Sequence, residues 1–424
     1  MSDKDQPAVL LIEHAAELVT IAGTQGPRKG SAQSDLGLIR DGALAAGADG
    51  RILAVGTTAE VHATVEPAPG AQVIDASGRA VLPGFVDPHT HTVFAGDRAD
   101  EFASRLEGAD YLEVLASGGG IISTVRATRA APAEQLEERA SRYLEEMLRH
   151  GTTTLEIKSG YGLSTEDELK MLRVASALEK TGPQGIVATF LGAHAVPPEY
   201  RGQPDRYVDL VVDEMMPRVA AEGLARYCDV FCERGAFSVD QSRRVLEAGL
   251  ARGLGAKIHA EQKSALGGAR LAAELGAVSA DHLEYATDED VAALVEAGTV
   301  AVLLPGAALM LMESHWAPAR RLIEAGVPVA LATDFNPGTC PILSMPLILG
   351  LACLRRLVTP AEAVVAATLN AAHAVGLGEQ VGSLEPGKRA DVVILDAPSH
   401  VHLAYWFGRN LVSMVIKDGR VVHS

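Results

Sequence analysis

The chain has 424 residues, of which 48% are hydrophobic and only 4% aromatic, so it can bury a large aliphatic core. Its formal charge of -17 argues against nucleic acids and anionic membranes as partners, because the summed field repels phosphates. The four cysteines are too few for a disulfide framework, and we expect buried, reduced thiols. The N-terminus does not resemble a secretion signal and no apolar run is long enough to span a membrane, which predicts a cytoplasmic protein.

The first 80 residues are typical of β-strands that follow one another without helices between them. Apolar runs that suit strands occupy 11–21, 42–56 and 71–81, and the second run is interrupted by Gly-Ala-Asp-Gly at 47–50. Glycine and aspartate at those positions predict a hairpin turn. This part of the chain is therefore expected to form strands of a small β-structure that contains one hairpin.

A different pattern begins near residue 81 and repeats as far as Asp334: a short apolar run that ends in polar residues or glycine, followed by an amphipathic stretch. Strands buried on both faces produce such continuous apolar runs, so the pattern favours a parallel (β/α)8 barrel. Side chains that cap helix N-termini are expected at Ser164, Ser238 and Thr359, each three residues before its partner. The eight predicted strand runs are 81–91, 152–160, 186–194, 228–235, 256–262, 277–284, 300–306 and 328–338.

The end of the chain returns to the strand pattern of its beginning, in 390–396 and 414–422. Because the termini of a domain often lie close together, we expect both ends to build one small β-sandwich. The predicted domains are residues 1–80 and 382–424 for the sandwich, in two parts, and residues 81–381 for the barrel.

Histidines and one aspartate fall at the carboxyl ends of predicted barrel strands. His89 and His91 are two residues apart, so on an extended strand their side chains point the same way. His259, His282 and Asp334 close three further strands. Since functional side chains of such barrels converge at the carboxyl face, these residues are expected to meet there.

Three imidazoles and one carboxylate, from His89, His91, His259 and Asp334, suit one divalent metal ion such as zinc or iron. A bound metal can lower the pKa of water from about 15.7 to about 7, which a histidine base alone cannot achieve. His282 is then left to orient that water and carry protons as the general acid and base. The sequence does not distinguish zinc from iron.

The motifs around these residues resemble those of the amidohydrolase superfamily, in 83–91, 332–338 and 382–396. Within it, the chain is most similar to the imidazolonepropionase family, over about residues 53–396. The segments that carry this resemblance are HTHTVFAGDRADEF (89–102), SGGGIISTVRATR (117–129), EIKSGYGL (156–163), FLGAHAVPPEY (190–200), KIHAEQ (257–262), ADHLEY (280–285) and ATDFNPGT (332–339).

The resemblance implies hydrolysis of 4-imidazolone-5-propanoate to N-formimidoyl-L-glutamate, a small-molecule reaction of histidine degradation, in a homodimer. The side chains that it implies for holding substrate or product are Arg98, Tyr161, His194, Gln262, Asn336, Gly338 and Thr339. Arg98 fits this role chemically, because its planar guanidinium matches a propanoate carboxylate. The alternative for Arg98 is a surface ion pair with Asp97 or Asp100.

Two other hypotheses remain: an amidohydrolase or deaminase that acts on another cyclic amide or amidine, and a barrel without catalytic activity. Related deaminases have a glutamate where this chain has Gln262, and an amide cannot shuttle a proton, which weakens the deaminase reading. Whether Glu261 or Gln262 assists His282 stays open. A barrel without catalytic activity would not need all four predicted metal ligands together with His282.

Further residues near the strand ends allow less specific hypotheses. Many two-metal relatives in the superfamily have a carboxylated lysine at the end of the fourth strand. Here that strand ends without a lysine (231–235), so the resemblance implies one metal, although Cys232 or Glu233 could bind a second. Lys158 is interpreted as structural or as a support for the site. The glycines at 118–120 could hinge a lid.

Overall fold

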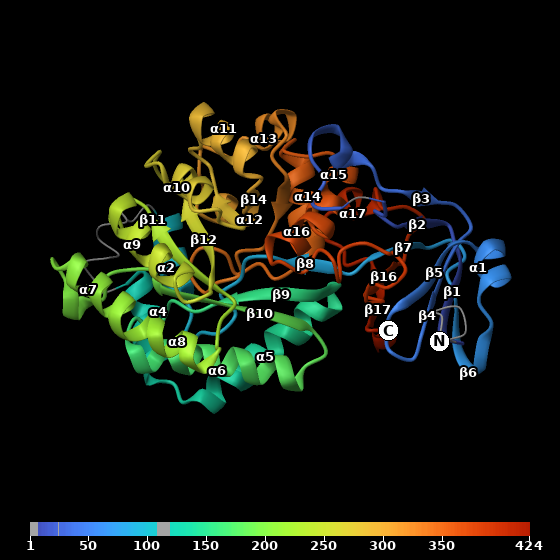
Figure 1. The fold of residues 1–424 in the computed structure, drawn as a ribbon, viewed down its shortest axis with the longest axis horizontal. Helices are drawn as coiled ribbons and strands as arrows, with labels where there is room; N and C mark the ends of the chain where they lie inside the picture. The colour runs from blue at the N-terminus through green and yellow to red at the C-terminus, as the bar shows by residue number, and fades with distance from the viewer. Residues whose placement is uncertain (1–6, 24, 108–118) are drawn as a thin grey trace.

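A parallel barrel dominates the computed structural model, which describes residues 7–23, 25–107 and 119–424 (Figure 1). Its strands follow one another in chain order around the sheet, from β8 to β15. A bridge between Thr90 and Phe335, just beyond those two edge strands, brings them together and nearly closes the barrel. This confirms the predicted (β/α)8 class. The barrel strands are β8 (Phe85–Asp87), β9 (Thr152–Lys158), β10 (Gly185–Ala193), β11 (Tyr227–Cys232), β12 (Gly255–Ala260), β13 (Ser279–His282), β14 (Val300–Leu303) and β15 (Val329–Leu331).

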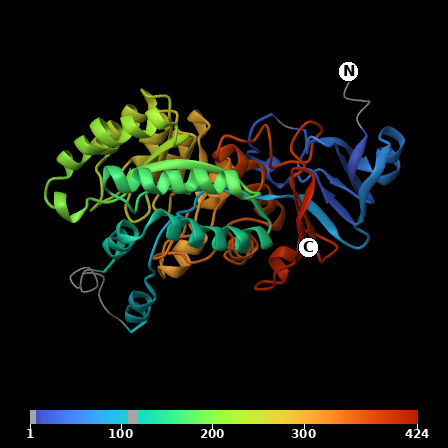
Figure 2. The ribbon, with the colours of Figure 1, turned by 90° about the horizontal axis from the view of Figure 1, so that it is seen from below.

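Helices surround the barrel strands, as Figure 2 shows from below. The predicted N-caps form: Ser164, Ser238 and Thr359 each accept a hydrogen bond from a backbone N–H three residues later. The helices of this part of the chain are α2 (Ala99–Leu106), α4 (Ile121–Ala130), α5 (Ala133–Arg149), α6 (Thr165–Thr181), α7 (Pro204–Leu210), α8 (Met216–Glu222), α9 (Val239–Leu250), α10 (Gly268–Glu274), α11 (Asp288–Ala297), α12 (Pro305–Met310), α13 (Ala319–Ala325), α14 (Met345–Leu354), α15 (Pro360–Ala366) and α16 (Leu369–Ala374).

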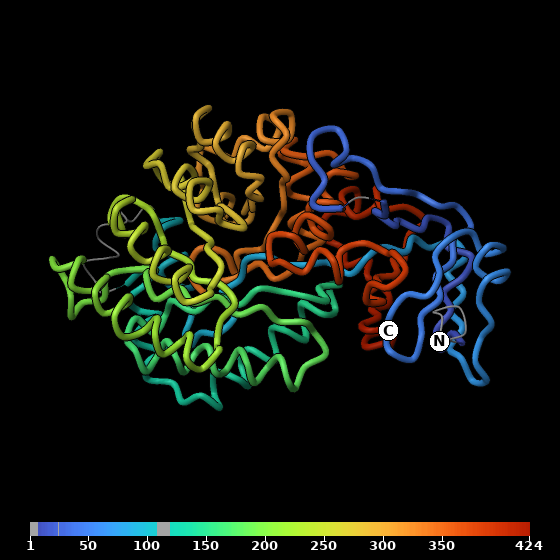
Figure 3. The backbone as a smooth tube through the Cα atoms, viewed as in Figure 1, coloured from blue at the N-terminus to red at the C-terminus, as the bar shows by residue number. Residues whose placement is uncertain are grey.

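Two smaller sheets lie at one end of the molecule, where the first and last segments of the chain run side by side (Figure 3). One has the order β5-β4-β1-β6, and the predicted turn at 47–50 joins β4 to β5 as an antiparallel hairpin. The other, β18-β17-β16-β7-β2-β3, combines strands from both ends of the chain, as expected. The elements here are β1 (Ala8–Ala15), β2 (Glu17–Val19), β3 (Leu38–Ile39), β4 (Gly42–Ala46), β5 (Ile52–Thr57), α1 (Thr58–Thr64), β6 (Pro67–Asp75), β7 (Ala80–Pro83), β16 (Val392–Leu395), α17 (His402–Tyr405), β17 (Val412–Lys417) and β18 (Arg420–His423). The exact domain boundaries at 81 and 382 stay a prediction.

The run predicted as the first barrel strand, 81–91, divides at Gly84. Before it, β7 pairs with β16 in the smaller sheet, and after it β8 pairs with β9 in the barrel. The Gly84 N–H donates to the Asp391 carbonyl, on the smaller-sheet side. A Cβ at Gly84 would lie 2.3 Å from the Thr153 Oγ1 atom, so only glycine permits this crossing.

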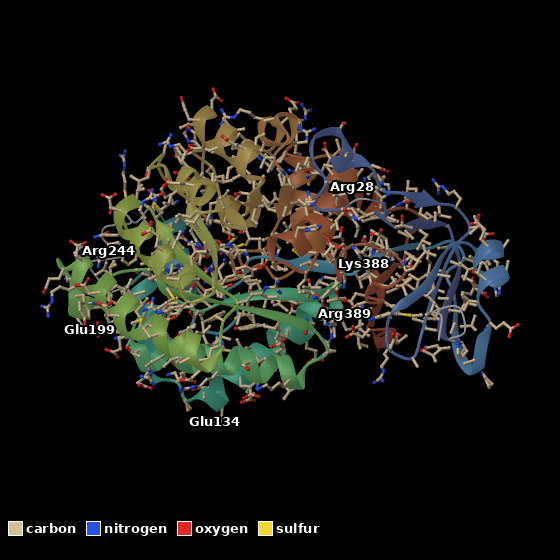
Figure 4. The ribbon with its side chains drawn as sticks, in the orientation of Figure 1. Arg28, Glu134, Glu199, Arg244, Lys388 and Arg389 are labelled. Carbon is tan, nitrogen blue, oxygen red and sulfur yellow. The ribbon has the colours of Figure 1, made fainter. Side chains whose placement is uncertain are left out.

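The N-terminal segment also packs against helices of the barrel. The backbone of Arg28, labelled in Figure 4, exchanges two hydrogen bonds with the Asn370 side chain in α16.

The barrel core is aliphatic, as the composition predicts, and the four cysteines are free thiols. In the described part of the chain, no helix combines the length and the apolar character that a membrane span requires.

Candidate metal centre

His89 and His91 follow β8 at the carboxyl end of the barrel, in the segment that closes the sheet against the last strand. The His91 N–H donates to the Phe335 carbonyl, and the Asp334 N–H donates to the His89 carbonyl. Backbone hydrogen bonds therefore bring both histidines beside Asp334, which lies far from them in the sequence. The distances from Asp334 Oδ1 to the Nε2 atoms of His89 and His91 are 3.5 and 3.6 Å.

His259 and His282 reach the same place from β12 and β13. Their ring centroids are 5.4 Å apart, and that of His259 lies 4.5 Å from the ring of His89. Three overlapping groups have donor atoms within 4.8 Å of one another: His89, His259 and His282; His91, His194 and His259; and His89, His91 and Asp334. The structure thus brings together the four predicted ligands and His282.

The backbone turns sharply at these positions. Glu261, His282 and Asp334 have φ values of 52°, 82° and 55°, in the left-handed region that side chains other than glycine rarely adopt. The predicted strand run 328–338 placed Asp334 on the strand. In the structure, Asp334 lies three residues beyond the end of β15. Such strained residues are typical of functional sites, where the surrounding structure holds them in place.

Two buried aspartates lie behind the predicted ligands His89 and His259. The Nδ1 atom of His89 lies 2.7 Å from Asp281 Oδ2 in a hydrogen bond. The Nδ1 atom of His259 lies 3.0 Å from Asp229 Oδ2, off the line of a hydrogen bond. Carboxylates placed in this way fix the proton on Nδ1 and leave Nε2 free to bind a metal.

The donor atoms fit a divalent cation. The Nε2 atoms of His89 and His259 are buried and have no hydrogen-bond partner among the described residues. Buried polar atoms in proteins are almost always satisfied, so atoms without protein partners that surround one point indicate a site for a bound ion. Together with the Asp334 carboxylate they form the nitrogen and oxygen set that zinc and iron(II) accept.

Arg98 lies beside Gly338, on the loop that follows Asp334. A Cβ at Gly338 would lie 1.1 Å from an Nη atom of Arg98, so the guanidinium occupies the space that a side chain would take. No carboxylate of the described residues forms an ion pair with Arg98, and its Nε has no partner there, which disfavours the surface ion pair. A guanidinium group without a carboxylate partner is available to an anionic ligand.

Tyr161 and His194 lie next to the predicted metal ligands. The rings of His194 and His91 are stacked, with centroids 5.1 Å apart, and the Tyr161 ring is 5.7 Å from that of His91. Burial and the neighbouring His259 lower the pKa of His194 to about 3, and Arg98 contributes in the same direction. His194 is therefore neutral, and its Nδ1 lies 3.1 Å from the Gly160 carbonyl.

Asn336, Gly338 and Thr339 shape the loop that follows Asp334. The Asn336 amide donates to the Asp334 carbonyl and to the Thr339 hydroxyl, and its oxygen accepts from the N–H groups of Gly338 and Thr339. These bonds use both donors of the amide. Asn336 thus supports the loop in this structure, while Gly338 provides space for Arg98.

Gln262 is half-buried and its side chain forms no hydrogen bond to the described parts of the chain. Its neighbour Glu261 points elsewhere, because its carboxylate accepts from the backbone N–H groups of residues 266–269 at the start of α10. A carboxylate held by so many backbone donors is committed to structure. Of the two residues that sequence left open, Gln262 is the one that stays free to meet a ligand.

The second-metal hypothesis finds no support in the described residues. Glu233 accepts hydrogen bonds from the backbone N–H groups of Lys263 and Ser264 and from the Ser264 hydroxyl. Burial raises the pKa of Cys232 to about 11, so its thiol is protonated. Neither residue belongs to a group of converging donor atoms.

The predicted lid falls partly on Gly118, which lies outside the described residues.

Sequence reasoning missed the groups that hold the site from behind. Asp229 interrupts an otherwise apolar strand and Asp281 lies in another buried barrel strand, and a carboxylate inside such a strand is the signal that could have identified them. Glu168 of α6 accepts hydrogen bonds from the backbone N–H groups of Gly160, Gly162 and Leu163, and so fixes the loop that carries Tyr161. This role has no local sequence signature.

Comparison with known proteins agrees with the fold. The amidohydrolase family model matches residues 80–422, and the chain belongs to that family. An adenosine deaminase from Xanthomonas campestris with bound zinc shares the fold, with a TM-score of 0.73 and 23% identity over 99% of this chain and 93% of that one. A guanine deaminase from E. coli does so with a TM-score of 0.71 and 17% identity over 98% and 99% of the two chains.

Much higher identity connects the chain to one branch of this family. The imidazolonepropionase of Symbiobacterium thermophilum is 57% identical over 98% of both chains, and that of Geobacillus kaustophilus is 53% identical over 97% of both. The chain is thus a hydrolase of the imidazolonepropionase family.

Proposed function

We propose that the protein hydrolyses the ring amide of 4-imidazolone-5-propanoate to N-formimidoyl-L-glutamate, a step of histidine degradation, at a centre with one zinc or iron ion. The observation that carries this proposal is identity of 53 to 57% with imidazolonepropionases over 97 to 98% of the chain. Deaminases share the fold at 23% identity or less, which carries no argument about substrate.

His89, His91, His259 and Asp334 would hold the metal. When bound, the metal supplies the Lewis acidity that makes water nucleophilic near neutral pH. His282 takes the proton of the attacking water and delivers it to the ring nitrogen as the carbon–nitrogen bond breaks. Its Nδ1 is buried and has no hydrogen-bond partner among the described residues, and Glu284 Oε2 lies 3.9 Å away and can stabilise the protonated ring.

Arg98 is proposed to hold the propanoate carboxylate of the substrate. A charge-assisted pair of hydrogen bonds from its guanidinium would set the distance between the carboxylate and the ring carbonyl. Tyr161, His194 and Gln262 are proposed to contact the imidazolone ring. Gly338 and Thr339 line the approach, and Asn336 keeps their loop in shape.

The activity test supplies imidazolone propanoate to the purified protein and follows the loss of its ultraviolet absorbance. We expect turnover that a strong chelator abolishes and that added zinc or iron(II) restores. Elemental analysis of the protein before chelation identifies the native metal. The same assay on Arg98→Ala separates specific recognition from general hydrolysis, because this variant keeps every proposed metal ligand.

Two outcomes would contradict the proposal. Release of ammonia from aminated purines or triazines, without opening of the imidazolone ring, would assign the protein to the deaminases. Full activity of a preparation that contains no transition metal would remove the metal centre.

The resemblance also implies a homodimer, which we propose as the working form. The exposed aromatic side chains Tyr405, Trp406 and Phe407, at the end of α17, offer an apolar surface for a second copy. Sedimentation equilibrium should give twice the mass of the 44.4 kDa chain. A monomeric mass at micromolar concentration would exclude it.

A further inference from the structure

A cluster of buried charges fills the barrel behind the ligand histidines. It consists of the side chains of Glu156, Lys158, Asp229, Lys257 and Asp281, and we call it the barrel ion cluster. None of these side chains has measurable exposure. A buried ion pair is weak evidence for a role in stability, because its desolvation can cost as much as its Coulomb attraction returns. The cluster therefore needs another explanation.

Lys158 lies at the centre of this cluster. Its Nζ atom is 2.7 Å from Asp229 Oδ2, 3.1 Å from Glu156 Oε2 and 3.3 Å from Asp281 Oδ2. The two aspartate oxygens are the same atoms that face the Nδ1 atoms of His259 and His89. One ammonium group thus contacts both carboxylates that stand behind the proposed ligands.

Lys257 has a different position in the cluster. Its Nζ atom contacts Glu156 Oε2 at 2.7 Å and the Pro88 carbonyl at 3.1 Å, and it contacts neither of the two aspartates. Glu156 is therefore shared between the two lysines, while Asp229 and Asp281 have only Lys158 as a lysine partner among the described residues.

We propose that Lys158 is a positioning residue for the metal centre, which fixes Asp229 and Asp281 so that His259 and His89 present Nε2 to the ion. The inference rests on the metal centre of the proposed function. It assigns to Lys158 a control over metal affinity that acts through two other side chains.

Electrostatics gives the physical reason. Without Lys158, the carboxylates of Asp229, Asp281 and Glu156 would remain in a space from which water is excluded. Lys257 would still contact Glu156, but the two aspartates would have no lysine partner among the described residues. The ammonium group of Lys158 contacts the same Oδ2 atoms that face His259 and His89. Without it, the two carboxylates lose the contact that holds these oxygens in place and no longer fix the orientation of the imidazoles in front of them.

The test measures metal affinity and not activity. The wild-type protein and Lys158→Met are stripped of metal, and zinc is titrated in competition with a chromophoric chelator. Methionine keeps much of the volume of lysine but has no charge. We expect the zinc dissociation constant to rise by about 10 to 100-fold, the range typical for loss of a group that supports metal ligands.

Lys417→Met is the matched control. Lys417 is equally buried and is paired with Asp391, but it lies in β17 of the smaller sheet. It should lose stability as Lys158→Met does while its zinc affinity stays within about 3-fold of wild type. If Lys417→Met weakens zinc binding as much as Lys158→Met, destabilisation alone explains the effect and the inference fails.

Lys158→Gln and Asp281→Asn provide a second route if the methionine variant does not fold. Each should weaken zinc binding, and the double variant should lose less than the product of the two single effects, because both act through one contact. Independent effects would overturn the inference. A wild-type protein that binds no metal would overturn the metal centre as well, whereas equal affinities in wild-type and variant proteins would overturn only the role of Lys158.

Discussion

Buried polar groups differ in their hydrogen bonding between the smaller sheets and the carboxyl end of the barrel, which we call its mouth. In the smaller sheets, the buried Lys417 donates to both oxygens of Asp391, at 3.0 and 2.9 Å, and His400 lies 2.9 Å from Glu17. At the mouth, by contrast, buried atoms of His89, His259, His282 and Arg98 have no partner among the described residues.

This difference separates groups that serve folding from groups kept for a ligand. A buried polar atom without a partner costs about 1–3 kcal/mol of free energy, so several such atoms gathered around one point indicate a site that a ligand completes. The unpartnered atoms at the mouth of the barrel suit the proposed cation at the histidines and the proposed anion at Arg98, whereas Lys417 and His400 of the smaller sheets have carboxylate partners. Substitutions at the mouth should therefore affect metal or substrate binding, whereas substitutions in the smaller sheets should affect stability.

The largest effect is expected for Asp334→Ala. The variant removes the one carboxylate among the proposed ligands, so the metal should be lost from the protein, and turnover should fall by more than the roughly 100-fold typical for groups behind a ligand. Elemental analysis and the ultraviolet assay measure the two losses, and circular dichroism shows whether the barrel is folded. A folded variant with its full metal content would show that the ligand set is wrong.

Arg98→Ala should have the next largest effect, and it should act on substrate binding. A hydrogen bond to a charged group contributes about 1.5–3 kcal/mol, which corresponds to a rise in KM of roughly 10 to 150-fold. Gly338→Ala tests the same contact from the other side, because its Cβ would displace the guanidinium. Both variants should retain metal. An unchanged KM in Arg98→Ala would remove this residue from the carboxylate site.

The proposed ligands could be predicted from sequence because their signals are local. The pair His89 and His91 shows the spacing of an extended chain, and His259 and His282 end apolar runs whose length and composition mark them as strands. The repeat of strand and helix then places these ends on one face without any knowledge of distances. The caps of the helices were equally legible, since each depends on residues three positions apart.

The groups around the ligands could not be predicted in this way, because they depend on contacts between distant segments. The hydrogen bond from His89 to Asp281 joins residues 192 positions apart, and the contact of Arg98 with Gly338 joins two different loops. The division of the first strand at Gly84 has the same origin: it depends on how closely Thr153 approaches, which the run of apolar residues does not reveal.

A smaller effect is expected for Glu168→Gln, which tests whether the mouth depends on its supporting loops. The variant replaces an acceptor of three backbone N–H groups by an amide that also carries donors, so stability should fall by about 1–3 kcal/mol. Displacement of Tyr161 should lower kcat/KM by about 10-fold or less. Glu166→Gln, on the exposed face of the same helix, is the control and should change neither quantity measurably. Unchanged kinetics in a destabilised Glu168→Gln would show that the loop does not set the position of Tyr161.

The smallest effect on catalysis is expected for Lys417→Met, although its effect on folding should be large. Without the lysine, Asp391 is left buried without its cation, which typically costs about 3–5 kcal/mol of stability. Denaturant unfolding should show this loss, while kcat and KM of the folded fraction should match those of the wild-type protein. Because Lys417 and Asp391 pair with each other inside the smaller sheet, the substitution should lower activity only by lowering the amount of folded protein. A changed KM in this variant would mean that the two regions are coupled, and the contrast between them would then fail.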